Sequence, residues 1–138
     1  MQPQLSISEI NEYLDEVFPQ MQGRFHVDAL SSMQATVRML AREEDLRPGN
    51  TVSGPAIFTL ADCAFYIAAL AMVGRKALTV TTSCHIDFMR KAPAGELIGE
   101  AKVHKLGRAL IVGDVLIHTG DEEKPIARAS LTYSIPPQ

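Results

Sequence analysis

One long apolar run, residues 53–74, constrains what this chain can fold into more than any other feature. Ser53 suits a helix N-cap, because its hydroxyl can accept a hydrogen bond from an otherwise unpaired backbone N–H. Pro55 is tolerated in a first helical turn, and Gly74 suits the left-handed position after the last turn. The run therefore predicts one helix that is apolar on every side and must be wrapped by other structure.

Asp62 is the only charged residue in this run. An ionised carboxylate is costly to move out of water unless it is paired or takes part in chemistry. The spacing alone leaves two interpretations open: a catalytic carboxylate, or a hydrogen-bonded structural one. A membrane span is disfavoured, because a carboxylate near the bilayer centre costs about 2.5–3.5 kcal/mol and no signal peptide or second hydrophobic span accompanies it.

Length and composition predict one domain over residues 1–138, since 138 residues with 46% hydrophobic content can build a core without disulfides. The net charge of -3 and the scattered basic residues disfavour nucleic-acid binding. Cys63 and Cys84 lie in apolar segments and are expected to be reduced core thiols, which fits a cytoplasmic protein.

Shorter elements flank the central helix. Residues 6–18 begin with a capping box and have helical spacing of apolar residues, and Pro19 ends this short helix. Residues 25–40 change to a period of two, which predicts either a hairpin or one long bent strand. Four strand-like segments follow, at 79–89, 96–106, 109–119 and 126–135. In the first, the alternation places on the core side Val80, Thr82, Cys84, Ile86 and Phe88.

An apolar helix followed by an antiparallel meander can bury itself only if the sheet curls around the helix. The predicted class is α+β, with about five to six antiparallel strands wrapped around one long central helix and a short N-terminal helix. Such a sheet has free edges, and the segment 79–89 is long enough to pair with its copy. We therefore expect a homodimer or a dimer of dimers.

The segments Ser53-Gly54-Pro55 and Leu60-Ala61-Asp62, with the Thr-rich strand after the helix, resemble the hotdog fold and most closely the PaaI-like acyl-CoA thioesterases. The resemblance implies that Asp62 is the catalytic carboxylate and that the Gly54 N–H binds the oxyanion. A backbone N–H at a helix start suits that role on physical grounds as well. The family histidine falls on Ser53 here, and the second glycine falls on Pro55.

The same resemblance implies roles for other polar residues. Thr81 matches a strand Ser or Thr that positions the catalytic water. The family asparagine, which helps to hold the substrate or water, falls on Arg47 by strict spacing, and Asn50 replaces it only with a loop adjustment. Contacts with the coenzyme A phosphates are implied for Arg90 and Arg108. No cofactor is implied, and no metal pair is indicated by the spacing of His26, His85, His104 and His118.

The leading functional prediction is hydrolysis of an acyl-CoA thioester, with Asp62 as general base or as nucleophile and Ser53 near the substrate. The site is expected at the dimer seam, with Gly54 of one chain facing Asp62 of the other. Two alternatives are a non-catalytic acyl-CoA-binding protein and an enoyl-CoA hydratase, which would require a histidine near the carboxylate. The pocket for the acyl group is expected to be shaped by Ala64, Phe65 and Ala68.

Overall fold

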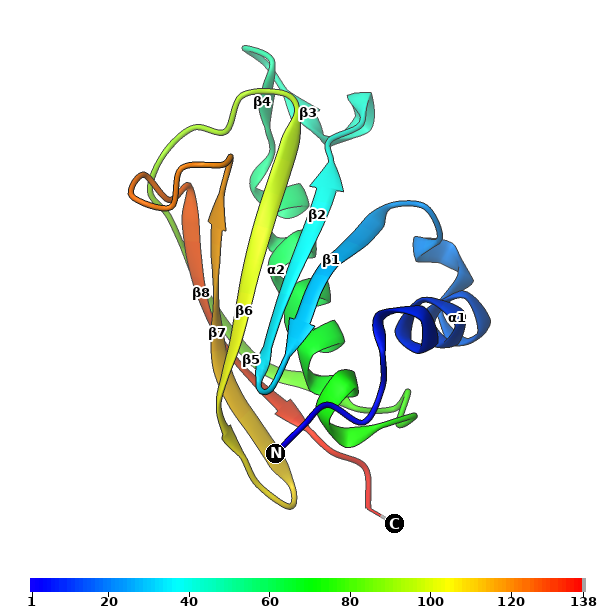
Figure 1. Cartoon of the computed structure of the whole chain (residues 1–138). Coiled ribbons are helices and arrows are strands. Elements are labelled where there is room, and N and C mark those ends of the chain that lie inside the picture. Colours follow the sequence, from blue (N-terminus) through cyan, green and yellow to red (C-terminus); the bar gives the residue numbers. More distant parts are fainter. Residues whose placement is uncertain (138) are drawn as a thin grey trace.

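The computed structural model describes residues 1–137 and shows a six-stranded antiparallel sheet wrapped around one helix (Figure 1). The helices are α1 Ile7–Val17 and α2 Gly54–Val73, with 3-10 turns at Pro19–Met21 and Glu43–Asp45. The main sheet has the order β1-β2-β6-β7-β8-β5. Its strands are β1 Phe25–Ser31, β2 Gln34–Leu40, β5 Val80–Phe88, β6 Glu96–Leu106, β7 Leu110–His118 and β8 Ala127–Ser134. A two-stranded hairpin, β3 Leu46–Arg47 and β4 Thr51–Val52, precedes α2. These elements confirm the predicted hotdog architecture.

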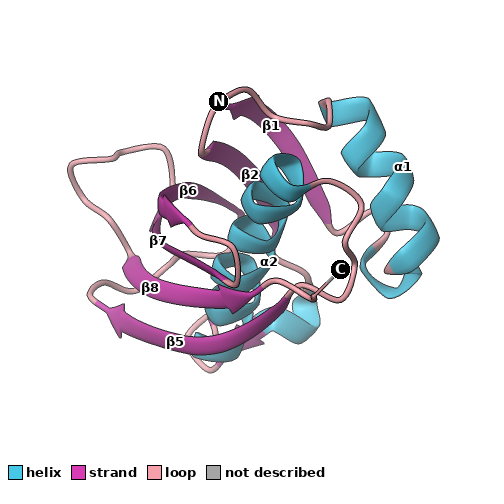
Figure 2. Cartoon of the chain, turned by 90° about the horizontal axis from the view of Figure 1, so that it is seen from below, coloured by secondary structure: helices cyan, strands magenta, loops and turns pink. Residues whose placement is uncertain are grey.

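Helix α2 lies inside the curl of the sheet, and α1 lies outside it (Figure 2). Leu60, Phe65 and Leu70, which lie along α2, are fully buried. By length and hydropathy alone α2 could also cross a membrane, but most of its side chains are buried against the sheet. The apolar run is therefore a core helix in this fold, as predicted.

The β1–β2 hairpin settles the two options left open by the sequence. The chain turns at Ser32 and Met33, and Met33 has a φ of 63°. The period-two pattern of β2 is confirmed, because Ala35, Val37 and Met39 are buried against the helix.

Strand β5 differs from the predicted alternation. A β-bulge lies between Thr81 and Ser83, where the register with β8 shifts. A bulge inserts one residue and changes which side chains face the core. Thr81 therefore faces the helix, whereas Thr82 is exposed and Val80 keeps 56% of its surface exposed. The prediction that Val80 and Thr82 face the core is wrong for this reason.

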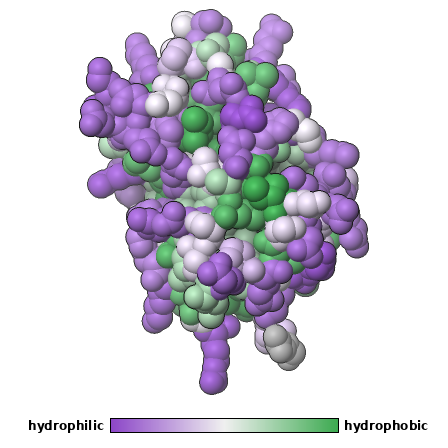
Figure 3. All heavy atoms as spheres, viewed as in Figure 1, coloured by the Kyte–Doolittle hydropathy of each residue, from purple (hydrophilic) through white to green (hydrophobic). Residues whose placement is uncertain are grey.

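The two edges of the sheet are β1 and β5. Helix α1 lies beside β1 (Figures 1 and 2). Strand β5 has no neighbour on its outer side among residues 1–137, and Phe88 at its end is 52% exposed. Hydrophilic side chains cover most of the face of the molecule shown in Figure 3.

Close contact between helix and sheet requires glycine at one position of β7. A Cβ atom added at Gly113 would meet the Lys102 carbonyl oxygen and would lie 2.5 Å from Phe65 Cε1. Neither the backbone of β6 nor the buried ring can move freely in a close-packed interior.

We predict that Gly113→Ala lowers the free energy of unfolding by about 3 kcal/mol, because overpacking typically costs ~1–3 kcal/mol and here one contact is with backbone. Gly99→Ala is the matched control, since its added Cβ would lie 3.3 Å from the Ala64 Cβ. Urea unfolding of both variants measures the difference. Equal, small losses would show that Gly113 does not set the helix-to-sheet distance.

Candidate active site

Asp62 faces strand β5 from the middle of α2. The Thr81 hydroxyl donates a hydrogen bond to Asp62 Oδ1 at 2.7 Å. The Tyr133 hydroxyl donates to the same oxygen at 2.6 Å and also lies 2.8 Å from the Asp62 carbonyl oxygen. The predicted pairing of Asp62 with Thr81 is thus present, and both hydroxyls hold one carboxylate oxygen.

Sequence reasoning did not find Tyr133. It continues the buried series Ala127, Ala129 and Leu131 along β8, where a purely apolar residue would be expected. A buried tyrosine usually finds a partner for its hydroxyl. The need for a partner could have linked Tyr133 to Asp62 in the sequence, because Asp62 is the only charged residue of the apolar run expected to be buried.

Asp62 lines a pocket of about 400 Å³ between α2, β5 and the end of α1. Other lining residues are mostly apolar or aromatic, and include Val17, Phe18, Cys63, Tyr66, Leu78 and Val80. No histidine lines it among residues 1–137. The end of α1 therefore contributes to the site, although its sequence indicated no such role.

The predicted acyl-pocket residues are wrong. Ala64, Phe65 and Ala68 are fully buried in the core and do not line this pocket. The sequence identified the right helix but not the side of it that the sheet leaves open.

Residues 77–79 form one wall of the pocket and are fixed by two tyrosines. The Tyr66 hydroxyl donates to the Ala77 carbonyl at 2.8 Å, and the Ala77 N–H donates to the Tyr13 hydroxyl at 2.9 Å. A third wall residue, Thr79, is 4% exposed, and its hydroxyl has no partner among residues 1–137. Such a hydroxyl typically costs ~1–3 kcal/mol, so this wall is not optimised for stability.

The two cysteines are poor nucleophiles. Burial, with a smaller effect from the Asp62 charge, raises the pKa of the Cys63 thiol to about 12. Burial also raises the pKa of Cys84. Since the thiolate is the reactive form, both residues stay inert thiols near neutral pH.

The start of α2 leaves one backbone N–H free. The Ser53 hydroxyl accepts from the Ala56 N–H at 3.3 Å, and the Ser53 carbonyl accepts from the Ile57 N–H at 3.1 Å. Pro55 has no N–H. Within residues 1–137 the Gly54 N–H has no hydrogen-bond partner, so it is the donor that the helix start can offer to a ligand.

Gly54 lines a second hollow, of about 450 Å³. A Cβ added at Gly54 would lie 3.5 Å from the Phe88 ring, which places the end of β5 beside the helix start. The hollow is also lined by the cationic residues Arg47, Arg90 and Lys91. It combines an apolar floor with positive charge next to the free N–H.

Two predicted site residues lie away from Asp62. Asn50 is exposed in the β3–β4 turn with a φ of 59° and lines neither of these pockets. Arg108 lies in the β6–β7 turn and lines a separate hollow with Met72 and Pro136. Figure 1 places the β6–β7 turn at the opposite end of the sheet from the β3–β4 hairpin.

Gly54 and Asp62 do not meet within one chain. They lie eight positions apart in α2, which corresponds to about 12 Å along a helix. A single carbonyl group cannot contact both.

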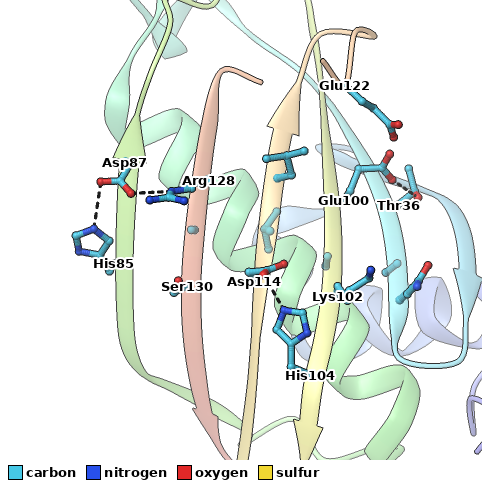
Figure 4. Close-up of a pocket in the computed structure, with 16 residues that line it drawn as sticks. Thr36, His85, Asp87, Glu100, Lys102, His104, Asp114, Glu122, Arg128 and Ser130 are labelled. Atoms are coloured by element: carbon cyan, nitrogen blue, oxygen red, sulfur yellow. Dashed lines mark hydrogen bonds and ion pairs between the residues drawn. The ribbon is translucent and has the colours of Figure 1, made fainter. Parts of the chain in front are cut away.

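A larger hollow, of about 720 Å³, lies on the outer face of the sheet and is lined by charged side chains (Figure 4). Many of them neutralise one another. Asp87 accepts from Arg128 at 3.0 Å, and this bond holds the pKa of Asp87 below its usual value. His104 lies 2.7 Å from Asp114. We therefore assign no chemistry to this hollow.

Glu100, His118 and Glu122 form a cluster at the edge of that hollow. The Gly120 N–H donates to His118 Nδ1 at 3.0 Å, so the neutral ring carries its proton on Nε2, which faces Glu100 at 3.2 Å. A metal ligand would need a lone pair on that nitrogen. The facing carboxylate of Glu100 raises the pKa of Glu122, and a shared proton can hold the two acids together.

A family model described as Thioesterase superfamily matches residues 49–126 of this chain. A candidate esterase from Archaeoglobus fulgidus is 32% identical over 105 residues, which are 73% of this chain and 65% of that protein. The chain therefore matches somewhat less than two thirds of that relative's length.

Solved structures show the same similarity. A candidate thioesterase from Silicibacter sp. TM1040 has a TM-score of 0.91 at 49% identity, covering 99% of this chain and 96% of that one. A mutant of the phenylacetic acid degradation protein PaaI from Thermus thermophilus has a TM-score of 0.73 at 25% identity, covering 86% of this chain and 99% of that one.

We predict that Ser53→Ala lowers the free energy of unfolding by about 1 kcal/mol, because it removes the cap of α2. Ser8→Ala, at an exposed position inside α1, is the control and should change stability by only a few tenths of a kcal/mol. Urea unfolding measures both. An unchanged stability of Ser53→Ala would contradict the capping role. A loss of turnover larger than the loss of folded protein would show that Ser53 also contacts the substrate.

Proposed function

The chain belongs to the thioesterase superfamily, and we propose that it hydrolyses the thioester bond of an acyl-CoA. The observation that carries the proposal is the Asp62 carboxylate, which is held by two hydroxyls at 2.6 and 2.7 Å in the wall of a largely apolar pocket. The pocket is of a size that suits a small acyl group. The acyl chain lies against Phe18, Tyr66 and Leu78, with its carbonyl carbon near Asp62.

Two courses are open to Asp62. As a general base it removes a proton from water while the water oxygen bonds to the carbonyl carbon; the C–S bond then breaks, and the coenzyme A thiolate takes up the proton. As a nucleophile it bonds to the carbonyl carbon itself, expels the thiolate and leaves an anhydride that water hydrolyses. In both courses negative charge develops on the carbonyl oxygen.

The Gly54 N–H of a second chain binds that oxygen. One donor of this kind is typically worth about 2.7–4 kcal/mol of barrier. Because the N–H of the same chain is about 12 Å from its own Asp62, the complete site requires two copies.

Strand β5 supplies the contact between the copies. Its Thr81 end lies at Asp62, and its Phe88 end lies at Gly54. Antiparallel pairing of β5 with its copy brings the Phe88 end of one chain beside the Thr81 end of the other. The exposed edge and the exposed Val80 and Phe88 side chains support this arrangement.

The coenzyme A phosphates bind the cations beside the helix start. Arg90 is exposed, donates to the Pro125 carbonyl at 2.8 Å, and lies near Arg47 and Lys91. Arg108 stays a predicted contact at the far end of the sheet. Asn50 stays a predicted water ligand that would have to move from its turn to reach the carbonyl group.

We predict that Asp62→Asn lowers acyl-CoA hydrolysis by at least ~10²-fold, because a neutral amide can neither accept the proton nor attack the carbonyl carbon. A panel of acyl-CoA substrates with free-thiol detection measures turnover, and calorimetry with the best substrate tests whether the variant still binds. Asp114→Asn, which changes a carboxylate on the outer face, is the control with wild-type turnover expected. Turnover of Asp62→Asn within about threefold of wild type would remove Asp62 from the mechanism.

The two-chain site makes a second prediction. Gly54→Pro removes the N–H donor at a first-turn position where proline is tolerated, and the extended Ser53 is compatible with a following proline. Gly54→Pro and Asp62→Asn should each be nearly inactive, but each lacks the half-site that the other keeps. After refolding together in equal amounts, half of the dimers should be mixed, so activity should return to about a quarter of wild type. A mixture no more active than the two separate variants would contradict the shared site.

A further inference from the structure

Tyr133 is buried at the point where β8 passes Asp62. Its side chain is 2% exposed, and its ring stacks on Tyr66 and contacts Phe65 at centroid distances of 6.2 and 5.2 Å. Its hydroxyl has two acceptors within reach, Asp62 Oδ1 at 2.6 Å and the Asp62 carbonyl oxygen at 2.8 Å. A carbonyl oxygen and an ionised carboxylate oxygen can only accept a hydrogen bond, so the phenol is the donor to both.

The phenol stays protonated near neutral pH. Burial raises the pKa of Tyr133, and the Asp62 charge beside it adds to this effect. The hydroxyl is therefore available as a donor at that pH. A buried phenol without an acceptor would be costly, so Tyr133 and Asp62 hold each other in one geometry.

Thr81 and Tyr133 reach Asp62 from adjacent strands. They are directly paired in the β5–β8 ladder, and the bulge after Thr81 turns its side chain toward the helix. Oδ1 thus receives two short hydrogen bonds. Oδ2 receives none from any of residues 1–137.

We propose that Tyr133 is a positioning residue that, with Thr81, fixes Oδ1 of Asp62 and leaves Oδ2 as the oxygen that reacts. The inference rests on the proposed role of Asp62 in hydrolysis. Oδ2 is the atom that takes the proton from water in one course, or bonds to the carbonyl carbon in the other. Without the phenol the carboxylate can rotate about its side-chain bonds, and either oxygen can then face the substrate at the wrong angle.

The decisive experiment compares Tyr133→Phe with Thr36→Val. Each variant loses one hydroxyl that donates to a carboxylate, but the Thr36 hydroxyl donates to Glu100 at 2.6 Å in the hollow on the outer face of the sheet and does not line the pocket. Loss of orientation at a reacting group can cost up to ~10²-fold in rate. We expect kcat of Tyr133→Phe to fall about 30-fold with KM for the best acyl-CoA within about twofold, and kcat of Thr36→Val to stay within about threefold.

A double variant separates positioning from general structural damage. In the Asp62→Asn background, Tyr133→Phe should lower the residual rate by less than about twofold, because there is no carboxylate left to position. A similar loss in both backgrounds would overturn the proposal, as would a Tyr133→Phe kcat equal to that of Thr36→Val. If Asp62→Asn itself remains active, the proposed catalytic role of Asp62 fails, whatever Tyr133 does. If the wild-type protein hydrolyses no acyl-CoA of the panel, the proposed function itself fails.

A measurement on the intact tyrosine covers the case in which Tyr133→Phe does not fold. Tyrosine labelled with ¹³C at Cζ reports the hydrogen bond of its hydroxyl by NMR. We expect the Tyr133 signal to shift between wild type and Asp62→Ala while the Tyr13 signal stays in place. An unchanged Tyr133 signal would show that its hydroxyl does not hold the carboxylate.

Discussion

An apolar helix without a polar side must be enclosed, and the rest of this structure depends on that requirement. The sheet curls around α2, and Gly113 leaves room for Phe65 between helix and strand. The sheet does not close on itself, because β5 has a free edge among the described residues. The one charged residue of the helix faces that side, so the polar chemistry of the molecule lies where its enclosure is incomplete.

Much of the fold followed from periodicity alone. The bounds of α2, the buried face of β2 and the four strands after the helix were all predicted within a few residues. The pairing of Asp62 with Thr81 was also predicted, but from family resemblance. The alternation rule alone placed Thr81 on the outer face, since nothing in the sequence of β5 marks the bulge that reverses it.

Other features depend on tertiary arrangement and could not be found by inspecting one segment at a time. Tyr133 is far from Asp62 in sequence and meets it only because β8 lies next to β5. The pocket wall includes Val17, from helix α1, which had no indicated function. Ala64 and Phe65 have the same apolar character as true lining residues, and only the direction in which the sheet curls decides that they are core.

The bulge in β5 also affects how relatives of this chain should be aligned. Thr81 and Cys84 both face the helix side although they are three residues apart, whereas in a regular strand inward residues are two apart. In a relative without the bulge, the residue that carries this hydroxyl would lie two positions, not three, before the next inward-facing residue of the strand. A sequence pattern with fixed spacing would miss that residue. An alignment without a gap at Thr82 would pair it with Thr82, which faces outward in this chain.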